Sequence, residues 1–398
     1  MASEATLLAG VDARSRARTS VVLLALLSAA HFSVDLYSAA LGAMQPLLAS
    51  KLGLSLTQAG ILGGVLIFSS SVMQPVYGYL CDRFHTRIFT VLAPGVAGFF
   101  ISALGLAPGF PTLVAMVALA GVGIAAFHPQ ASTTASQIAG ARRGRWLAIF
   151  ISAGMLGLAV GPAYFSIVIG RLGLEGAAWA ALPGLLMSVL LYLRLRADSL
   201  ARPASPRGFD LRSLAPIWKP MTRLYTLVFI RSMVQVTFSQ FLPLYLTRER
   251  GMAVADASYA LSIYLASGAF GGFVGGNLAD RIGGRRVILL SMMGSVPFLF
   301  VFFAGTGLPA MIGLALGGLM LLFTNPVNIV MAQELAPGQS GTVSALMMGF
   351  AWGMAGFIFI PLTGWASEFF GMHSVLMTLA AMPLVGFLIA LKLPKEKA

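Results

Sequence analysis

Long apolar runs separated by short polar loops dominate the chain. Each run is close to or above the roughly 20 residues that a helix needs to cross the hydrocarbon core of a bilayer. Twelve such runs are predicted, at 20–49, 57–80, 88–107, 110–138, 146–169, 174–194, 222–247, 256–279, 287–305, 308–334, 341–366 and 373–392. Because the alternation of a membrane barrel is missing, we predict an all-α integral membrane protein with twelve transmembrane helices.

The two halves of the pattern repeat. GYLCDRFHTR at 78–87 and GNLADRIGGR at 276–285 lie 198 positions apart, and the prolines 46 and 243, and 129 and 326, lie 197 apart. Internal repeats of spanning helices are typical of secondary transporters, whose sites lie between the halves near mid-membrane. We therefore predict two pseudo-symmetric six-helix bundles, 1–193 and 222–398, joined by a linker at 194–221.

Composition and charge set the environment and the orientation. Hydrophobic residues make up 58% of the chain and charged residues 10%, against about a quarter charged in soluble domains. The net charge of +13 does not indicate nucleic-acid binding, because the basic residues fall in short clusters between apolar runs. With both termini and the basic linker placed in the cytoplasm, 21 of the 26 lysines and arginines lie inside, which follows the positive-inside rule.

The repeated loop motif G-x-x-x-D-R-x-x-x-R joins the second and third helices of each half. Its carboxylate can cap a neighbouring helix or pair with an arginine across the bundle, and so hold one transport state. With its twelve helices, two halves and repeated motif, the chain resembles the major facilitator superfamily over essentially all its length. The resemblance implies alternating access by rocking of the bundles. It also implies a cytoplasmic gate latch at the motif residues, which are Gly78, Asp82, Arg83, Arg87, Asp280, Arg281 and Arg285.

One carboxylate, Asp35, falls in mid-membrane, where a charge costs at least about 3 kcal/mol. With His31, Ser38, Gly42 and Gln45 it forms a polar stripe on one helix face, which we expect to face the cavity between the bundles. A structural pair with an arginine or a histidine is one interpretation. The other is a proton-coupling site, in which Asp35 gains and loses a proton beside His31 and His128.

Arg231 is the only basic residue inside a predicted span. It either snorkels to the cytoplasmic surface or faces the cavity, where it suits an anionic substrate or a pairing with Asp35. Gln235, four residues on, continues its polar stripe and favours the cavity. The other polar side chains that we predict to contact substrate are Gln45, Gln130, Asn325 and Asn328.

Two further motifs carry resemblances. The segment with Gly157, Gly161 and Pro162 resembles the antiporter motif of the superfamily, which is associated with exchange for protons, although helix packing also explains it. HFSVDLYSAALGAMQPLL and AAFHPQAS resemble the fosmidomycin-resistance branch, whose members carry His-x-x-x-Asp in helix 1 and Phe-His-Pro-Glu in helix 4. His31, Asp35 and the segment 127–129 match, whereas Gln130 replaces the acid by an amide.

The prediction is a proton-coupled antiporter of a bacterial inner membrane. It would export a small drug or metabolite, such as an anion or a phosphonate, and act as a monomer with the substrate, protons and the lipid bilayer as its partners. No cofactor or metal is expected, since no cluster of His, Cys and acid stands at ligand spacing. An uptake symporter for an organic anion and an integral-membrane enzyme are the alternatives. We expect no enzyme, because clustered catalytic groups at one depth are missing from the sequence.

Overall fold

The computed structural model describes residues 21–84, 86–138, 143–195, 216–336, 339 and 343–394, and its regular elements are all helices. The first half begins with a helical span, Val21–Leu52, that ends in α2 (Ala40–Leu52). It continues with α3 (Leu56–Ile67), η1 (Phe68–Val72), α4 (Gln74–Phe84), α5 (Ile88–Ser102), η2 (Ala103–Leu106), α6 (Phe110–Ile138), α7 (Arg143–Gly176), η4 (Ala177–Ala181) and α8 (Leu182–Arg194).

The second half follows the same plan. Its elements are α9 (Trp218–Arg248), α10 (Val254–Ile282), α11 (Gly284–Ala304), α12 (Gly307–Leu322), α13 (Thr324–Leu335), η8 (Ala345–Ala351), α15 (Trp352–Phe370), α16 (Met372–Ala381) and α17 (Pro383–Ala390). The short elements η1 and η8 are π-helical and contact each other across the two halves.

The helices make twelve crossings of the membrane. Eleven helices in the described ranges are long and apolar enough to span a bilayer, and one of them, Trp146–Arg194, has 49 residues. A helix of that length would extend about 74 Å, far beyond a hydrocarbon core of about 30 Å. The chain turns at Gly173, whose φ of 74° favours glycine, so this stretch makes two crossings. The prediction of an all-α, twelve-helix membrane protein is confirmed.

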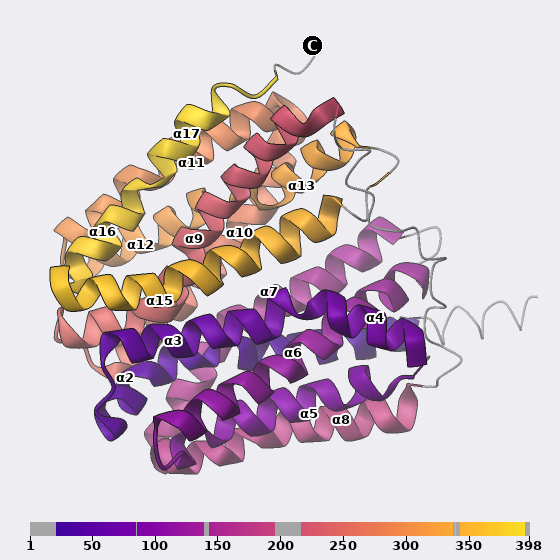
Figure 1. Ribbon diagram of the computed structural model, residues 1–398, viewed down its shortest axis with the longest axis vertical. Helices are drawn as coiled ribbons and strands as arrows, with labels where there is room; N and C mark the ends of the chain where they lie inside the picture. Colours follow the sequence, from indigo (N-terminus) through magenta and orange to yellow (C-terminus); the bar gives the residue numbers. More distant parts are fainter. Residues whose placement is uncertain are drawn as a thin grey trace, which may run out of the picture.

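The helices form two bundles, with α2 to α8 in one and α9 to α17 in the other (Figure 1). Between the bundles α3 packs on α15, α7 on α10, and α2 on α9. A Cβ added at Gly60 would lie 2.7 Å from the carbonyl oxygen of Ile360, and one at Gly64 would lie 2.6 Å from Cγ of Pro361. Only glycine allows the backbones of α3 and α15 to approach this closely.

This close packing lies toward one face of the molecule, here named the far side. At this face α2 ends at Leu52, α3 begins at Leu56 and α15 ends at Phe370. The opposite face, where α4 and α8 end, is named the motif side. At the far side the backbone N–H of Thr57 donates to Oε1 of Glu368 over 2.8 Å, joining the two bundles. The far side is therefore closed by packing and by a hydrogen bond at the amino end of α3.

The repeat is visible at atomic detail. A Cβ at Gly78 would lie 3.5 Å from Pro129, and a Cβ at Gly276 would lie 3.5 Å from Pro326. In both halves, then, the glycine of the loop motif rests against the proline of the fourth helix. This equivalence supports two repeated bundles. Residues 196–215 of the linker predicted at 194–221 lie outside the described residues, and the domain boundaries stay a prediction.

Candidate functional site

Asp35 and His31 lie one turn apart on the first span, and both are 8% exposed. The Nε2 atom of His31 is 3.3 Å from Oδ2 of Asp35. The other ring nitrogen, Nδ1, is 2.8 Å from the carbonyl oxygen of Phe150 on α7. A carbonyl oxygen only accepts hydrogen bonds, so Nδ1 carries a hydrogen and donates it. The orientation of the imidazole is thereby set by a neighbouring helix.

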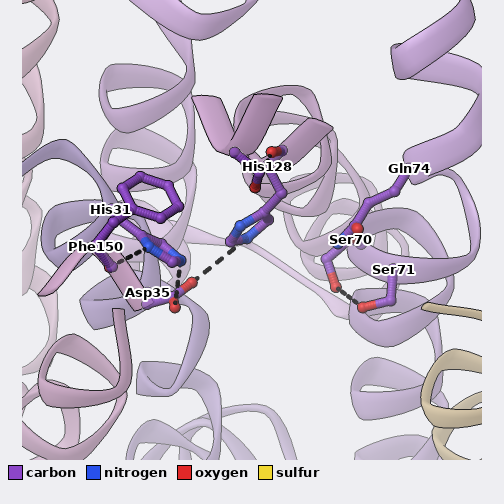
Figure 2. A network of polar contacts seen from close by, with 8 residues as sticks. His31, Asp35, Ser70, Ser71, Gln74, His128 and Phe150 are labelled. Atoms are coloured by element: carbon purple, nitrogen blue, oxygen red, sulfur yellow. Dashed lines mark hydrogen bonds and ion pairs between the residues drawn. The ribbon is translucent and has the colours of Figure 1, made fainter. Parts of the chain in front are cut away.

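His128 reaches the same carboxylate from α6. Its Nε2 atom is 3.5 Å from Oδ1 of Asp35, and its ring centroid is 5.2 Å from that of His31 (Figure 2). Ligand-capable atoms of the three side chains all lie within 4.8 Å of one another. The structure thus brings together the three residues predicted for proton coupling, and the expectation that no cluster of histidine and acid exists is wrong. Ligand spacing along the sequence did not reveal this cluster, because His128 joins from a helix 93 positions further along the chain than Asp35.

Helix α7 packs against the first span through three glycines. A Cβ at Gly157 would collide with the carbonyl oxygen of Phe32, and one at Gly161 with that of Leu36. At Gly154, a Cβ would lie 2.5 Å from Oδ2 of Asp35. Gly157 and Gly161 thus allow close helix contact on both sides of Asp35. The contribution of Gly154 was missed from sequence, although it precedes Gly157 by three residues and shares its face.

The polar stripe of the first span does not face an open cavity along its whole length, which corrects the expectation. A Cβ at Gly42 would collide with the backbone of Ser239 on α9. The Gln45 amide, 1% exposed, donates to the carbonyl of Ala59 and, over 3.4 Å, to Oε1 of Gln240. Gln45 therefore lies in the far-side contact between the bundles, because the far side is packed shut.

Arg231 is 4% exposed, within the second bundle. One of its terminal amino groups donates to Oε1 of Gln235 over 2.6 Å. Since α9 runs from the motif side to the far side, this contact directs the guanidinium away from the motif-side surface. The buried side chain thus points opposite to a snorkelling arginine. In the described part of the chain, Asp35 is paired with histidines, and no ion pair with Arg231 is found.

In the described part of the chain, buried polar atoms on α9, α10 and α13 are without hydrogen-bond partners. They include Nε of Arg231, the hydroxyl of Tyr264 on α10, and both amide atoms of Asn328 on α13. Tyr264 interacts electrostatically with Arg231, and the three helices pack on one another. A buried polar group left unpaired costs about 1–3 kcal/mol, so such groups are suited to a polar ligand. Sequence reasoning missed Tyr264, although a hydroxyl in mid-span was a usable signal.

Comparison with known proteins decides the family. The model of the Major Facilitator Superfamily matches residues 26–252 and 224–398. The chain belongs to the Major Facilitator Superfamily. It is therefore a multi-pass membrane transporter and not an enzyme.

Individual relatives agree with this assignment to the superfamily. The chain is 33% identical over 386 residues to an MFS-type transporter of Bacillus subtilis (strain 168), YfnC, covering 94% of this chain and 93% of that protein. It is 29% identical over 384 residues to the fosmidomycin resistance protein of Escherichia coli (strain K12), with the same coverage. A bacterial homologue of the human lysosomal transporter Spinster, solved in an inward-facing and occupied conformation, has the same fold. Its TM-score is 0.78 at 15% identity, over 94% of this chain and 96% of that one.

Gln130, a predicted substrate contact, has hydrogen-bond partners within its own bundle. Thr90 donates to its Oε1, and its Nε2 donates to the carbonyl of Thr86 over 3.0 Å. The amide is thus bound by the first turn of α5 and by the segment just before it, and the side chain joins α6 to α5 within one bundle. Asn325 is half-buried next to Pro326 and stays a predicted substrate contact.

The terminal arginine of each loop motif binds inside its own bundle. Arg87 donates to the carbonyls of Tyr192 and Leu195 at the end of α8, and its guanidinium lies 5.0 Å from the Tyr192 ring. In the second half Arg285 donates to the carbonyl of Leu391, just after α17. Each arginine therefore caps the carboxyl end of the last helix in its half, where the helix dipole favours a cation.

The remaining motif residues are at the surface. Arg83, Asp280 and Arg281 are exposed, and the side chain of Asp82 lies outside the described residues. A cytoplasmic latch between the bundles stays a prediction. It would form when the motif side closes.

Proposed function

We propose that this transporter is a proton-coupled antiporter that exports a small anionic solute across the bacterial inner membrane. The observation that carries the proposal is the enclosure of the Asp35 carboxylate by the His31 and His128 imidazoles within the first bundle. A carboxylate in a span must be neutralised, and a proton is a neutralising ion that can be gained and lost in each cycle. The antiporter-like glycines, Gly157 and Gly161, pack beside this site and support exchange.

The hydrogen bonding of His31 supports a mobile proton. Because Nδ1 already donates to Phe150, the contact between Nε2 and Oδ2 of Asp35 must itself contain a hydrogen. Either the imidazolium donates to the carboxylate, or the carboxylic acid donates to the neutral imidazole. In both cases the pair holds one exchangeable proton and no net charge. His128, 3.5 Å from the other carboxylate oxygen, is placed to pass the proton on.

Arg231 is proposed to bind the anionic group of the solute. Its buried guanidinium has an unpaired Nε, and the unpaired polar atoms of Tyr264 and Asn328 lie on the adjoining helices. A buried cation is stabilised by an anionic partner, and the planar guanidinium binds carboxylates and phosphonates through two parallel hydrogen bonds. Similarity to a fosmidomycin resistance protein supports a phosphonate solute, since fosmidomycin is a phosphonate.

The packed far side supports an inward-facing state in this structure. With the basic loops in the cytoplasm, the motif side faces the cytoplasm and the far side faces out. The antiporter would then rock between this state and one in which the motif side is closed. Both termini would be cytoplasmic.

Proteoliposomes containing the purified protein test coupling and direction together. With fosmidomycin as the probe, a proton gradient directed into the vesicles should drive preloaded fosmidomycin outward. Inward accumulation under the same gradient would instead establish the uptake symporter. If fosmidomycin flux does not change when a proton gradient is imposed in either direction, proton coupling is refuted.

A further inference from the structure

We propose that Gly154 is a positioning residue of the coupling site. The missing side chain at this position of α7 sets where the Asp35 carboxylate and the His31 imidazole lie. The effect on coupling rests on the proposed function, whereas the effect on the position of His31 does not. Neither the loop motif nor the antiporter-like motif includes this residue.

A side chain at position 154 would meet the functional atoms of Asp35 and His31. A Cβ there would lie 2.5 Å from Oδ2 of Asp35, 2.5 Å from Nε2 of His31 and 2.6 Å from Cε1 of the same ring. Non-bonded carbon contacts are comfortable only at about 3.5–4.0 Å. A methyl group at this position therefore forces apart the two atoms between which the exchangeable proton lies.

The neighbouring glycines act differently. A Cβ at Gly157 or Gly161 meets the backbone of Phe32 or Leu36, which cannot yield unless the whole helix moves. At Gly154 the struck atoms are the ends of side chains, which can rotate away. Substitution at Gly157 or Gly161 should therefore destabilise the bundle, whereas substitution at Gly154 should leave a folded protein with a displaced site.

Helix α7 also connects the site to the second bundle. The carbonyl of Phe150 binds the far nitrogen of the His31 ring, so α7 holds this imidazole from two directions. Further along α7, the backbone N–H of Ala163 donates to the hydroxyl of Ser262 on α10 over 3.0 Å. One helix thus contacts both the coupling site and the other bundle. A shift of α7 on protonation of the site would therefore move the contact between the bundles. The charged group that faces Asp35 and His31 from another helix is His128, on α6.

The position of His31 is tested by nitrogen-15 NMR of histidine-labelled protein in lipid nanodiscs. Gly154→Ala should shift the His31 ring-nitrogen signals, which a His31→Gln variant assigns. The matched control is Gly170→Ala on the same helix, where a Cβ meets nothing within 4 Å, and it should leave the signals in place. Unchanged His31 signals in folded Gly154→Ala would overturn the inference.

Transport is measured on the same samples in two modes. Gly154→Ala should lower gradient-driven fosmidomycin flux by about tenfold to a hundredfold, in line with the effect of small displacements at reacting groups. Fosmidomycin–fosmidomycin exchange, which needs no net proton movement, should be largely kept. Shifted His31 signals with unchanged gradient-driven flux would support the positioning role and refute the proton role of this site.

A double-mutant cycle keeps the inference testable if Gly154→Ala folds poorly. Combining Gly154→Ala with Asp35→Ala, or with His31→Ala, removes an atom that the new methyl group strikes. Each double variant should regain part of the lost thermal stability, so the effects of the two substitutions should not add. Strict additivity in both cycles would show that the methyl group does not meet these side chains, and would overturn the proposal.

Discussion

At the residue scale, the environment of Asp35 is set by three neighbours that differ in their origin. His31 comes from the same helix and contacts Oδ2, His128 comes from α6 and contacts Oδ1, and Phe150 from α7 fixes the imidazole through its carbonyl. The carboxylate therefore has polar partners while it remains 8% exposed. This combination fits the proposed proton site, in which the carboxyl group is neutral in one state and charged in the other.

Asp35→Asn should abolish proton-driven transport and leave the fold intact. Asparagine keeps the shape and one acceptor oxygen, but its second terminal atom is a donating amide nitrogen and the side chain cannot ionise. The measurement is proton flux coupled to fosmidomycin in proteoliposomes, with circular dichroism as the check on folding. Wild-type coupling in the purified variant would make Asp35 a structural residue.

Arg231→Lys should raise the fosmidomycin concentration needed for half-maximal transport, by about tenfold or more. Lysine keeps the charge but loses the planar fork that binds two oxygens at once. The matched control is Arg223→Lys at the motif-side start of the same helix, which should transport as the wild type does. If Arg231→Lys also transports normally, the guanidinium does not bind the solute.

At the element scale, the contact between α3 and α15 decides which face is closed. The Glu368 carboxylate lies at the amino end of α3, where the helix dipole favours an anion, and accepts from the backbone of Thr57. This contact crosses from one bundle to the other. We therefore expect it to form only while the far side is closed and to act as a far-side latch.

Glu368→Gln should increase the outward-facing population, because glutamine keeps an acceptor but loses the charge. Spin labels on the far-side ends of α3 and α15 should report longer distances, most clearly at low ionic strength. Glu175→Gln is the matched control, since Glu175 pairs with Lys51 inside one bundle at 2.7 Å. A distance distribution that responds equally to both variants would argue against the latch.

Asp82→Asn and Asp280→Asn should each raise the inward-facing population, if the motif carboxylates close the motif side. Loss of one charge-assisted contact can shift a balanced equilibrium by about tenfold. Spin-label distances between the motif-side ends of α4 and η8 give the measurement. Asp256→Asn, in the first turn of α10 at the other face, serves as control. Distances that stay at their wild-type values would remove these residues from the gate.

At the scale of the whole molecule, the basic loops predict a single orientation. On a Cys81→Ser background, Ser205→Cys in the linker should resist a membrane-impermeant maleimide in intact cells. Thr306→Cys, in an exposed far-side turn between α11 and α12, should react readily. The reverse labelling pattern would place the linker and both termini outside and invert the proposed direction of transport.

Much of the architecture could be predicted from the sequence, because it depends on local properties. Twelve apolar runs, the repeat at offsets of 197 and 198, and the lone mid-span carboxylate are each readable from position and residue type. The break between the fifth and sixth crossings is readable as well, since the predicted runs end at 169 and begin at 174 and the chain turns at Gly173. The spacing of His31 and Asp35 also sufficed to place them on one face, because four residues make about one helical turn.

The completed site was decided by tertiary packing. Which helix presents His128 to Asp35, which carbonyl binds His31, and why Gly154 must lack a side chain all depend on how α6 and α7 lie against the first span. Gln130 was assigned to the substrate from its neighbours in sequence, yet its amide is bound by Thr90 and Thr86. Such contacts join residues tens to more than a hundred positions apart. Hydrophobic period and charge determine that a helix crosses the membrane, but close packing of side chains determines which of its faces meets which partner.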